Sequence, residues 1–279
     1  MKWGDFWRQF RKDSAALFGL LMLLILLFTA VVGPSLVRAD PTQQNLQLRR
    51  APVSAMDPFG RDQFGRDMLS RIVHGASVTM LSGVVATAIG SVFGFLAGLI
   101  SGYLRGWVDE VLMRAVDLML AFPFFLVAIL IVGILGPELR NAILAVGIAK
   151  IPIFARYVRG VTLKLAQEDF IEAAQAVGAN KLRIMLVHIV PNVTIPAIVL
   201  ATVELASTIL SVSGLSFLGL GAQPPTPEWG LMLSESRSYF QQAPHIMIFP
   251  GVFLSLLVLS INLVGDGLQL ATDPRRRGS

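Results

Sequence analysis

Long apolar runs alternate with shorter polar segments along the whole chain. Each run has about the 20 residues that a helix needs to cross a bilayer core. The six runs cover residues 15–37, 77–102, 111–135, 142–161, 187–211 and 246–270. The longer polar segments are 38–76, 156–186 and 215–245. The pattern predicts an all-α, polytopic membrane protein with six transmembrane helices.

The first apolar run has a second interpretation. A basic, amphipathic segment at 3–12 precedes it, as in a signal peptide. The run is longer than a typical signal-peptide core, however, and no small-x-small cleavage site follows Val37. We therefore expect this segment to be retained as the first transmembrane helix.

Composition supports a membrane protein and excludes several kinds of site. Hydrophobic residues make up 54% of the 279 residues and charged residues only 15%, with a mean hydropathy of +0.67. Cysteine is absent, which excludes disulfides and thiolate metal sites. The three histidines, His74, His188 and His245, are too far apart for a local metal motif. The net charge of +5 comes from residues between the apolar runs, so we interpret it as a topology signal and not a nucleic-acid surface.

The distribution of Lys and Arg predicts that both termini are cytoplasmic. With the N-terminus inside, the inner segments carry 14 basic residues and the outer segments eight. Six arginines in the first outer segment, 38–76, depart from this rule. Because that segment also holds Asp40, Asp57, Asp62 and Asp67, we expect it to be folded, with its charges paired internally.

Small residues recur at every fourth position of the second run. Residues four apart share one helix face, so this spacing makes a smooth surface that another helix can approach closely. The residues are Ser82, Ala86, Gly90, Gly94, Gly98 and Gly102. The spacing fits packing within the subunit and contact with another chain equally well.

The segment 168–192 predicts a short helix that must dock on something. Asp169 with Glu172 forms a variant of the capping box, and Gly178 is placed as the C-terminal stop. A helix of about eight residues is marginal alone in water. Its apolar side chains lack a local core; they are Phe170, Ile171, Ala173, Ala174 and Val177. The docking surface is the chain's own bundle, the lipid interface or a partner protein.

Ionisable residues inside the apolar runs are candidates for function. Lys150 and Glu204 fall within the fourth and fifth runs, and the helical rise puts them at depths about 5 Å apart. They either pair or line a translocation path, or each contacts water independently. In the third run Arg114 and Asp117 are spaced to pair with each other, and Pro123 permits a kink.

Several motifs together resemble one family. Glu172, Ala173, Ala174, Gly178 and Pro191 reproduce the EAA signature of bacterial ABC importer permeases. Further similar stretches lie at 57–77, 114–123, 215–233 and 262–274. The chain resembles the dipeptide/oligopeptide/nickel/glutathione group of binding-protein-dependent inner-membrane components, in particular the dipeptide permease C type. Two positions depart from the family pattern: Arg61 stands where threonine is usual, and Asp57 where histidine is common.

The resemblance implies the type I importer (MetI-like) fold in three parts. Residues 1–76 would hold an interfacial helix, the first span and an extended periplasmic loop. Residues 77–271 would form the transmembrane core, with a coupling loop at 168–191. Residues 272–279 would be a basic cytoplasmic tail. In this family the coupling loop seats in a cytoplasmic ATPase; the matching residues are Asp169, Glu172, Ala173, Ala174, Gly178 and Pro191.

The resemblance also implies the partners and cargo. A second permease, one or two ATPases and a substrate-binding protein would assemble with this chain in the bacterial inner membrane. The chain would not itself be an enzyme or hold a cofactor, since ATP and magnesium would bind the ATPases. The cargo would be a short peptide, with nickel chelate and glutathione as alternatives.

Two other classes of protein remain to be tested. An intramembrane serine protease would use Ser211, Ser213 or Ser216, but these form no GxSxG elbow and His188 is expected near the opposite face. An ion-coupled transporter would need an embedded carboxylate, for which Glu204 is the one good candidate. The sequence contains no GxxxxGK[ST] loop to bind nucleotide phosphates.

Overall fold

The computed structural model describes residues 9–272, and helices dominate that range. Its long helices are α2 (Ser14–Val31), α4 (Met68–Leu104), α7 (Leu139–Leu165), α10 (Val190–Phe217) and α12 (His245–Thr272). These five are long and apolar enough to cross a membrane; α10 does so as part of a continuous helical segment, Lys181–Phe217. Six spans result only if the bent pair α5 and α6 counts as one. The segment 3–12 and the tail 272–279 fall largely outside the described residues.

The shorter elements connect these helices. They are α3 (Gly33–Leu36), η1 (Leu46–Leu48), α5 (Gly106–Leu120), α6 (Phe124–Leu135), α8 (Asp169–Ala176), α9 (Lys181–Arg183), η2 (Ile184–Ile189), α11 (Trp229–Ser236) and η3 (Arg237–Tyr239). Within residues 9–272 the only β-pairing is an isolated bridge between Arg61 and Asp67.

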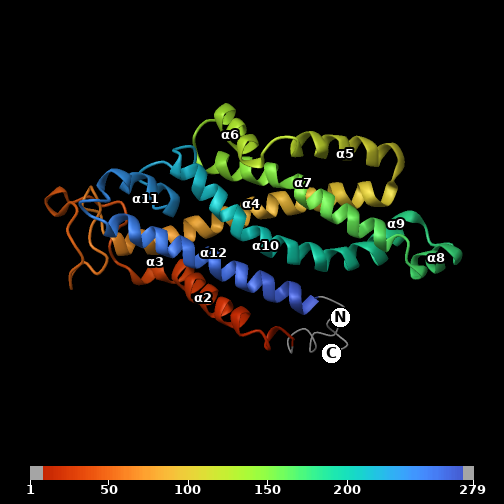
Figure 1. Ribbon diagram of the computed structural model, residues 1–279, viewed down its shortest axis with the longest axis horizontal. Coiled ribbons are helices and arrows are strands. Elements are labelled where there is room, and N and C mark those ends of the chain that lie inside the picture. The colour runs from red at the N-terminus through yellow and green to blue at the C-terminus, as the bar shows by residue number, and fades with distance from the viewer. Residues whose placement is uncertain (1–8, 273–279) are drawn as a thin grey trace.

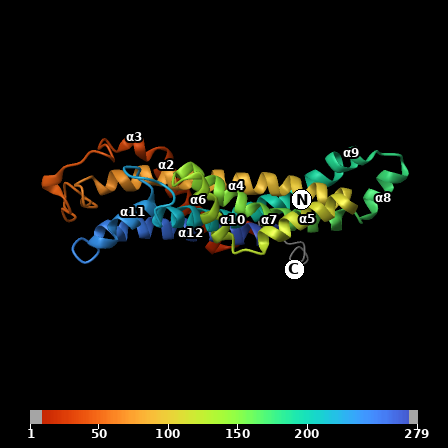
Figure 2. The ribbon, with the colours of Figure 1, turned by 90° about the horizontal axis from the view of Figure 1, so that it is seen from above.

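The long helices lie side by side in an elongated bundle (Figures 1 and 2). The loop between α3 and α4 lies with α11 at one end, which we call the loop end. The short helices α8 and α9 lie at the opposite end, the α8 end. The start of α2 and the finish of α12 point toward the α8 end (Figure 1). The molecule therefore has two distinct extremities joined by apolar helices.

Exposed apolar side chains cover the outside of the bundle. On α2, for example, Leu21, Leu24 and Phe28 are each more than half exposed. A soluble domain of this size would rarely expose so much contiguous apolar surface. These faces are therefore suited to contact with lipid or with another membrane helix.

The glycine seam of α4 packs against α7 of the same chain. A Cβ added to Gly90 would lie 2.8 Å from the Lys150 Cβ, and one added to Gly102 would lie 2.8 Å from the Thr162 Cβ. Gly94 and Gly98 similarly abut the α7 backbone at Ile151 and Ala155. Any side chain at these positions would force the two helices apart, so the seam fixes α4 and α7 as one unit.

The third run is not the single span expected at 111–135. It divides into α5 and α6, whose axes differ by 89° at residues 121–123. Pro123 is the cap before α6 and has no N–H to continue the α5 hydrogen-bond ladder. The expected pairing of Asp117 with Arg114 is wrong. Asp117 instead accepts a 2.6 Å hydrogen bond from Arg156 on α7. Near the start of α5, Asp109 accepts two 2.6 Å bonds from Arg159 of α7. These bonds fasten α5 to α7.

Candidate functional site

The short helix α8 stands at the end of the molecule, and its first turn is acidic. Glu168 occupies the N-cap position with extended backbone, and its side chain makes no capping hydrogen bond. The expected capping role of Asp169 is therefore wrong: Asp169 is the first helical residue. Asp169 and Glu172 both lie in the first turn, where negative charge is favourable to the helix dipole.

The other end of α8 is closed by Gly178. The Gly178 N–H donates to the Gln175 carbonyl at 2.9 Å, and the Ala179 N–H donates to the Ala174 carbonyl at 3.1 Å. These two bonds form a Schellman motif. Gly178 has a φ of +84°, a conformation that is costly for any residue with a Cβ. The helix thus ends sharply at the position that the sequence spacing indicated.

Ile171 is the buried apolar anchor of α8 on the bundle, and the half-buried Ala174 packs against the same cluster. Ile171 is buried in a cluster with Leu99 of α4, Val158 of α7, Ile184 and Ile189. The other apolar positions are open: Ala173 is exposed, Phe170 is 44% exposed and Val177 is 85% exposed. One face of α8 is therefore packed within the chain, and the opposite face has no partner among the described residues.

The segment after α8 joins it directly to the long helix α10. Helix α9 leads into the π-helical turn η2, and Pro191 follows as the second residue of α10. Pro191 has no N–H, and its ring crowds the carbonyl four residues back, so a widened turn before it is expected. The Asn192 side chain donates to the His188 carbonyl at 2.7 Å and satisfies that group. After the turn that ends α8, the chain thus runs into α10 as one helical segment, Lys181–Phe217.

Farther along α10, Glu204 meets Lys150 of α7. The Lys150 Nζ lies 2.7 Å from Glu204 Oε2 and 2.8 Å from the Ser207 hydroxyl. It also lies 4.8 Å from the centre of the Phe124 ring at the start of α6. The Lys150 side chain is only 4% exposed and that of Glu204 19%. The structure thus brings together the two ionisable residues of the fourth and fifth runs.

Comparison with known proteins identifies the architecture. The family described as the binding-protein-dependent transport system inner membrane component matches residues 90–278. A second family, the N-terminal transmembrane domain of oligopeptide transport permease C, matches residues 2–52. The chain belongs to this family of ABC importer permeases. The resemblance seen in the EAA signature and its companion motifs is confirmed.

Individual relatives are similar to the permease over nearly all of its length. The glutathione transport system permease protein GsiD of Escherichia coli O6:K15:H31 is 44% identical over 280 residues, covering 99% of this chain and 91% of that protein. GsiD of Shigella flexneri serotype 5b is 46% identical with the same coverage. A chain from inward-facing structures of the MetNI methionine ABC transporter superposes with a TM-score of 0.61 at 22% identity. That alignment covers 74% of the permease and 98% of the other chain, so the fold is shared.

At the loop end the permease buries a network of charges. Arg66 and Arg71 are each 1% exposed and lie between Asp62 and Glu235. Glu235 Oε2 lies 2.9 Å from Arg66 Nη2 and 3.2 Å from Arg71 Nη2. Asp62 Oδ2 lies 3.5 Å from Arg71 Nε and also accepts a hydrogen bond from Arg66 Nε. Since Glu235 belongs to α11, the network fastens the first loop to the 215–245 segment. The expected internal pairing exists, and it reaches beyond the loop.

A second buried carboxylate holds α11 in place. Glu228 is fully buried at the N-cap of α11, where it accepts 2.8 Å from the Leu231 N–H and 2.7 Å from the Ser213 hydroxyl. The neighbouring Trp229 is also fully buried and donates its indole N–H to the Ile72 carbonyl at 3.1 Å. Sequence reasoning did not single out Glu228 or Glu235. For Glu235 the available signal was the excess of arginine in the first loop, which needed acidic partners elsewhere; Glu228 bonds hydroxyl and amide groups, to which that signal does not apply.

The two residues that depart from the family pattern contact each other. Arg61 Nη2 lies 2.8 Å from Asp57 Oδ1, and Arg61 also donates to the Gly65 carbonyl at 3.1 Å. The pair stabilises the turn that leads into α4. At the start of the same loop, hydrogen bonds from the Thr42 hydroxyl and amide hold the pKa of Asp40 below its usual value.

The three serines of the protease alternative serve α10 and its loop. Ser211 donates to the Ser207 carbonyl, Ser213 donates to Glu228, and Ser216 accepts the Ala222 N–H. His188 lies before the start of α10, whereas the serines lie near its other end. The structure therefore assembles no serine–histidine pair from these residues.

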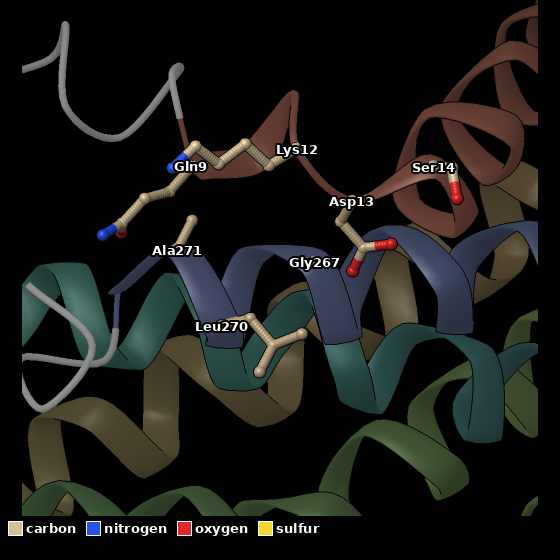
Figure 3. A pocket seen from close by; sticks show the side chains of 7 residues that line it. All are labelled: Gln9, Lys12, Asp13, Ser14, Gly267, Leu270 and Ala271. Carbon is tan, nitrogen blue, oxygen red and sulfur yellow. The ribbon is translucent and has the colours of Figure 1, made fainter. Parts of the chain in front are cut away.

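A cavity of about 390 Å³ opens beside the start of α2 and the end of α12 (Figure 3). Its lining residues are Gln9, Lys12, Asp13, Ser14, Gly267, Leu270 and Ala271. The Asp13 carboxylate caps α2 by accepting from the Ala15 and Ala16 N–H groups. The cavity lies away from the Lys150 cluster and contributes nothing to that site.

Proposed function

We propose that this permease and a homologous second permease form the membrane part of an ATP-driven importer in the bacterial inner membrane. Both termini are cytoplasmic in this proposal, which the excess of Lys and Arg on that side supports. Since α2 starts and α12 finishes toward the α8 end (Figure 1), α8 is then cytoplasmic and the loop end is periplasmic.

Helix α8 is the coupling helix in this proposal, and its half-packed state is the observation that carries it. Ile171 holds one face, whereas Ala173 and the other exposed positions leave an apolar face without a partner. A groove in a cytoplasmic ATPase would cover that face. Asp169, Glu172, Ala174, Gly178 and Pro191 shape the helix and its link to α10. ATP and magnesium belong to the ATPase subunits, and this chain supplies no catalytic group.

The proposed cargo is a short peptide, with glutathione foremost among the candidates. The basis is the name of the relatives, which are glutathione transport permeases and are 44–46% identical over 99% of the chain. A substrate-binding protein would deliver the cargo to the loop end, where the buried charge network provides a fixed surface. Lys150 and Glu204 are proposed to lie beside the translocation path, because a carboxylate is costly on a lipid-facing surface.

The test uses the complete complex in vesicles with its binding protein and ATPases. Ala173→Glu places a charge on the open face of α8, and we expect ATP-driven uptake of labelled glutathione or dialanine to fall at least about tenfold, since an unpaired buried charge costs several kcal/mol. The matched control is Ala15→Glu, at an exposed alanine in the first turn of α2, outside both α8 and the loop end.

Two outcomes would refute the proposal. One is full ATP-driven uptake by the Ala173→Glu complex together with normal recovery of the ATPase. The other is uptake driven by an ion gradient in vesicles that lack the ATPases, which would identify an ion-coupled transporter.

A further inference from the structure

Lys150 lies where three parts of the bundle meet. Its base on α7 is pressed against α4, since a Cβ at Gly90 would come within 2.8 Å of the Lys150 Cβ. Its ammonium group contacts Glu204 and Ser207 on α10, and the ring of Phe124 at the start of α6. Phe124 directly follows the break at Pro123. One buried side chain therefore connects α7, α10 and the bent third span.

Around Lys150, ion pairs and the glycine seam tie three helices of the bundle together. The glycine seam joins α4 to α7, and the pairs Asp109–Arg159 and Asp117–Arg156 join α5 to α7. These three helices form one unit, the seam unit. Helix α10 packs against this unit through apolar contacts, for example where Ile209 lies against Gly83 of α4. It is also the helix that continues from the segment after α8, as part of the helical run Lys181–Phe217. Glu204 lies 14 residues after Val190, about 21 Å along the helix.

The Lys150–Glu204 pair is suited to break and re-form. A buried ion pair contributes little net stability, because desolvation of the two charges offsets most of their attraction. Glu204 and Ser207 keep part of their surface open, so another polar group or water has access to the carboxylate when the lysine leaves. A small rotation of α10 would move Glu204 away from Lys150, whose base is fixed on the seam unit.

We propose that the Lys150–Glu204 pair, with Ser207 and Phe124, is a latch that holds α10 to the seam unit until the ATPases move α8. Lys150 and Glu204 are positioning residues in this inference: they restrain α10 and thereby suppress the transport cycle in the absence of cargo. The inference rests on the proposed function, because it requires an ATPase that acts through α8.

The test compares ATP hydrolysis with uptake in the complete complex. Lys150→Met and Glu204→Gln are each expected to raise cargo-independent ATP hydrolysis at least about fivefold, the lower end of usual coupling energies. Uptake per ATP should fall in both. The exchanged double variant, Lys150→Glu with Glu204→Lys, should bring hydrolysis and uptake back toward the unmodified complex. Asp117→Asn is the matched control, since its ion pair lies within the seam unit.

A merely structural role would give a different result. Loss of folding lowers hydrolysis and uptake in parallel, and thus a parallel fall, or no change in either, would overturn the latch. If only the exchanged variant failed to fold, the rise in hydrolysis in the two single variants would still decide the question. An unmodified complex without ATP-driven uptake would instead refute the proposed function, and the latch with it.

Discussion

The two ends of the permease are built on opposite principles. At the loop end, two buried arginines, two carboxylates and the fully buried Trp229 tie the first loop to α11. At the α8 end, one buried isoleucine and the half-buried Ala174 attach an eight-residue helix to the bundle. The loop end resists deformation because each of its charges would be left unpaired by a displacement. A displacement of α8 would break the small apolar contacts of Ile171 and Ala174, which suits the coupling role proposed for this helix.

The largest effect is expected from breaking the charge network at the loop end. Arg66→Met leaves Asp62 and Glu235 short of a partner, and removing one member of a buried pair costs about 3–5 kcal/mol. Denaturant unfolding of the purified permease in detergent would measure the loss. Arg140→Met is the control, because its pair with Glu138 has side chains 79% and 51% exposed and is worth less than about 1 kcal/mol. Equal losses in the two variants would contradict a rigid loop end.

A smaller effect on global stability is expected from Ile171→Ala at the α8 end. The substitution removes the anchor of α8, and an apolar truncation of this size costs about 2–5 kcal/mol where the side chain is buried. Because Ile171 is the buried side chain of α8, we expect the loss to appear as local detachment, with faster proteolysis at 168–180 and unchanged unfolding of the bundle. Val177→Ala, at an 85% exposed position, is the control. Unfolding of the whole bundle by Ile171→Ala would show that α8 is integral to the core.

Features set by local geometry were accessible from the sequence. Gly178 was predicted to end the short helix because a Schellman motif depends on a few neighbouring residues. The similar depths of Lys150 and Glu204 followed from the constant rise of a helix, and the structure brings their charged groups to 2.7 Å. The glycine seam was predicted as a contact surface, although its partner, α7, was not.

Features set by long-range packing were not accessible. Pro123 predicts a kink, but not the 89° bend that the structure has there. The size of the bend depends on how Phe124 and Phe125 pack against α7 and α10. Asp117 was matched with Arg114 in its own helix, whereas the structure offers Arg156 on α7. Glu235 lies 169 residues from Arg66, and no local pattern connects them. The predicted start of α8 is one residue too late: the N-cap is Glu168 and not Asp169, and because both residues are acidic the sequence does not distinguish them.

Hydrogen exchange of the permease pair, with and without its ATPases, tests the contrast between the two ends most directly. The account predicts that exchange at the α8 amides, 169–176, slows at least about tenfold when the ATPase binds, which corresponds to about 1.4 kcal/mol of added protection. The amides of α11, 229–236, should keep their rates, because the loop end is already fixed. Unchanged exchange at α8 in an intact complex, or slowing confined to α11, would contradict the proposal that the ATPase docks on α8.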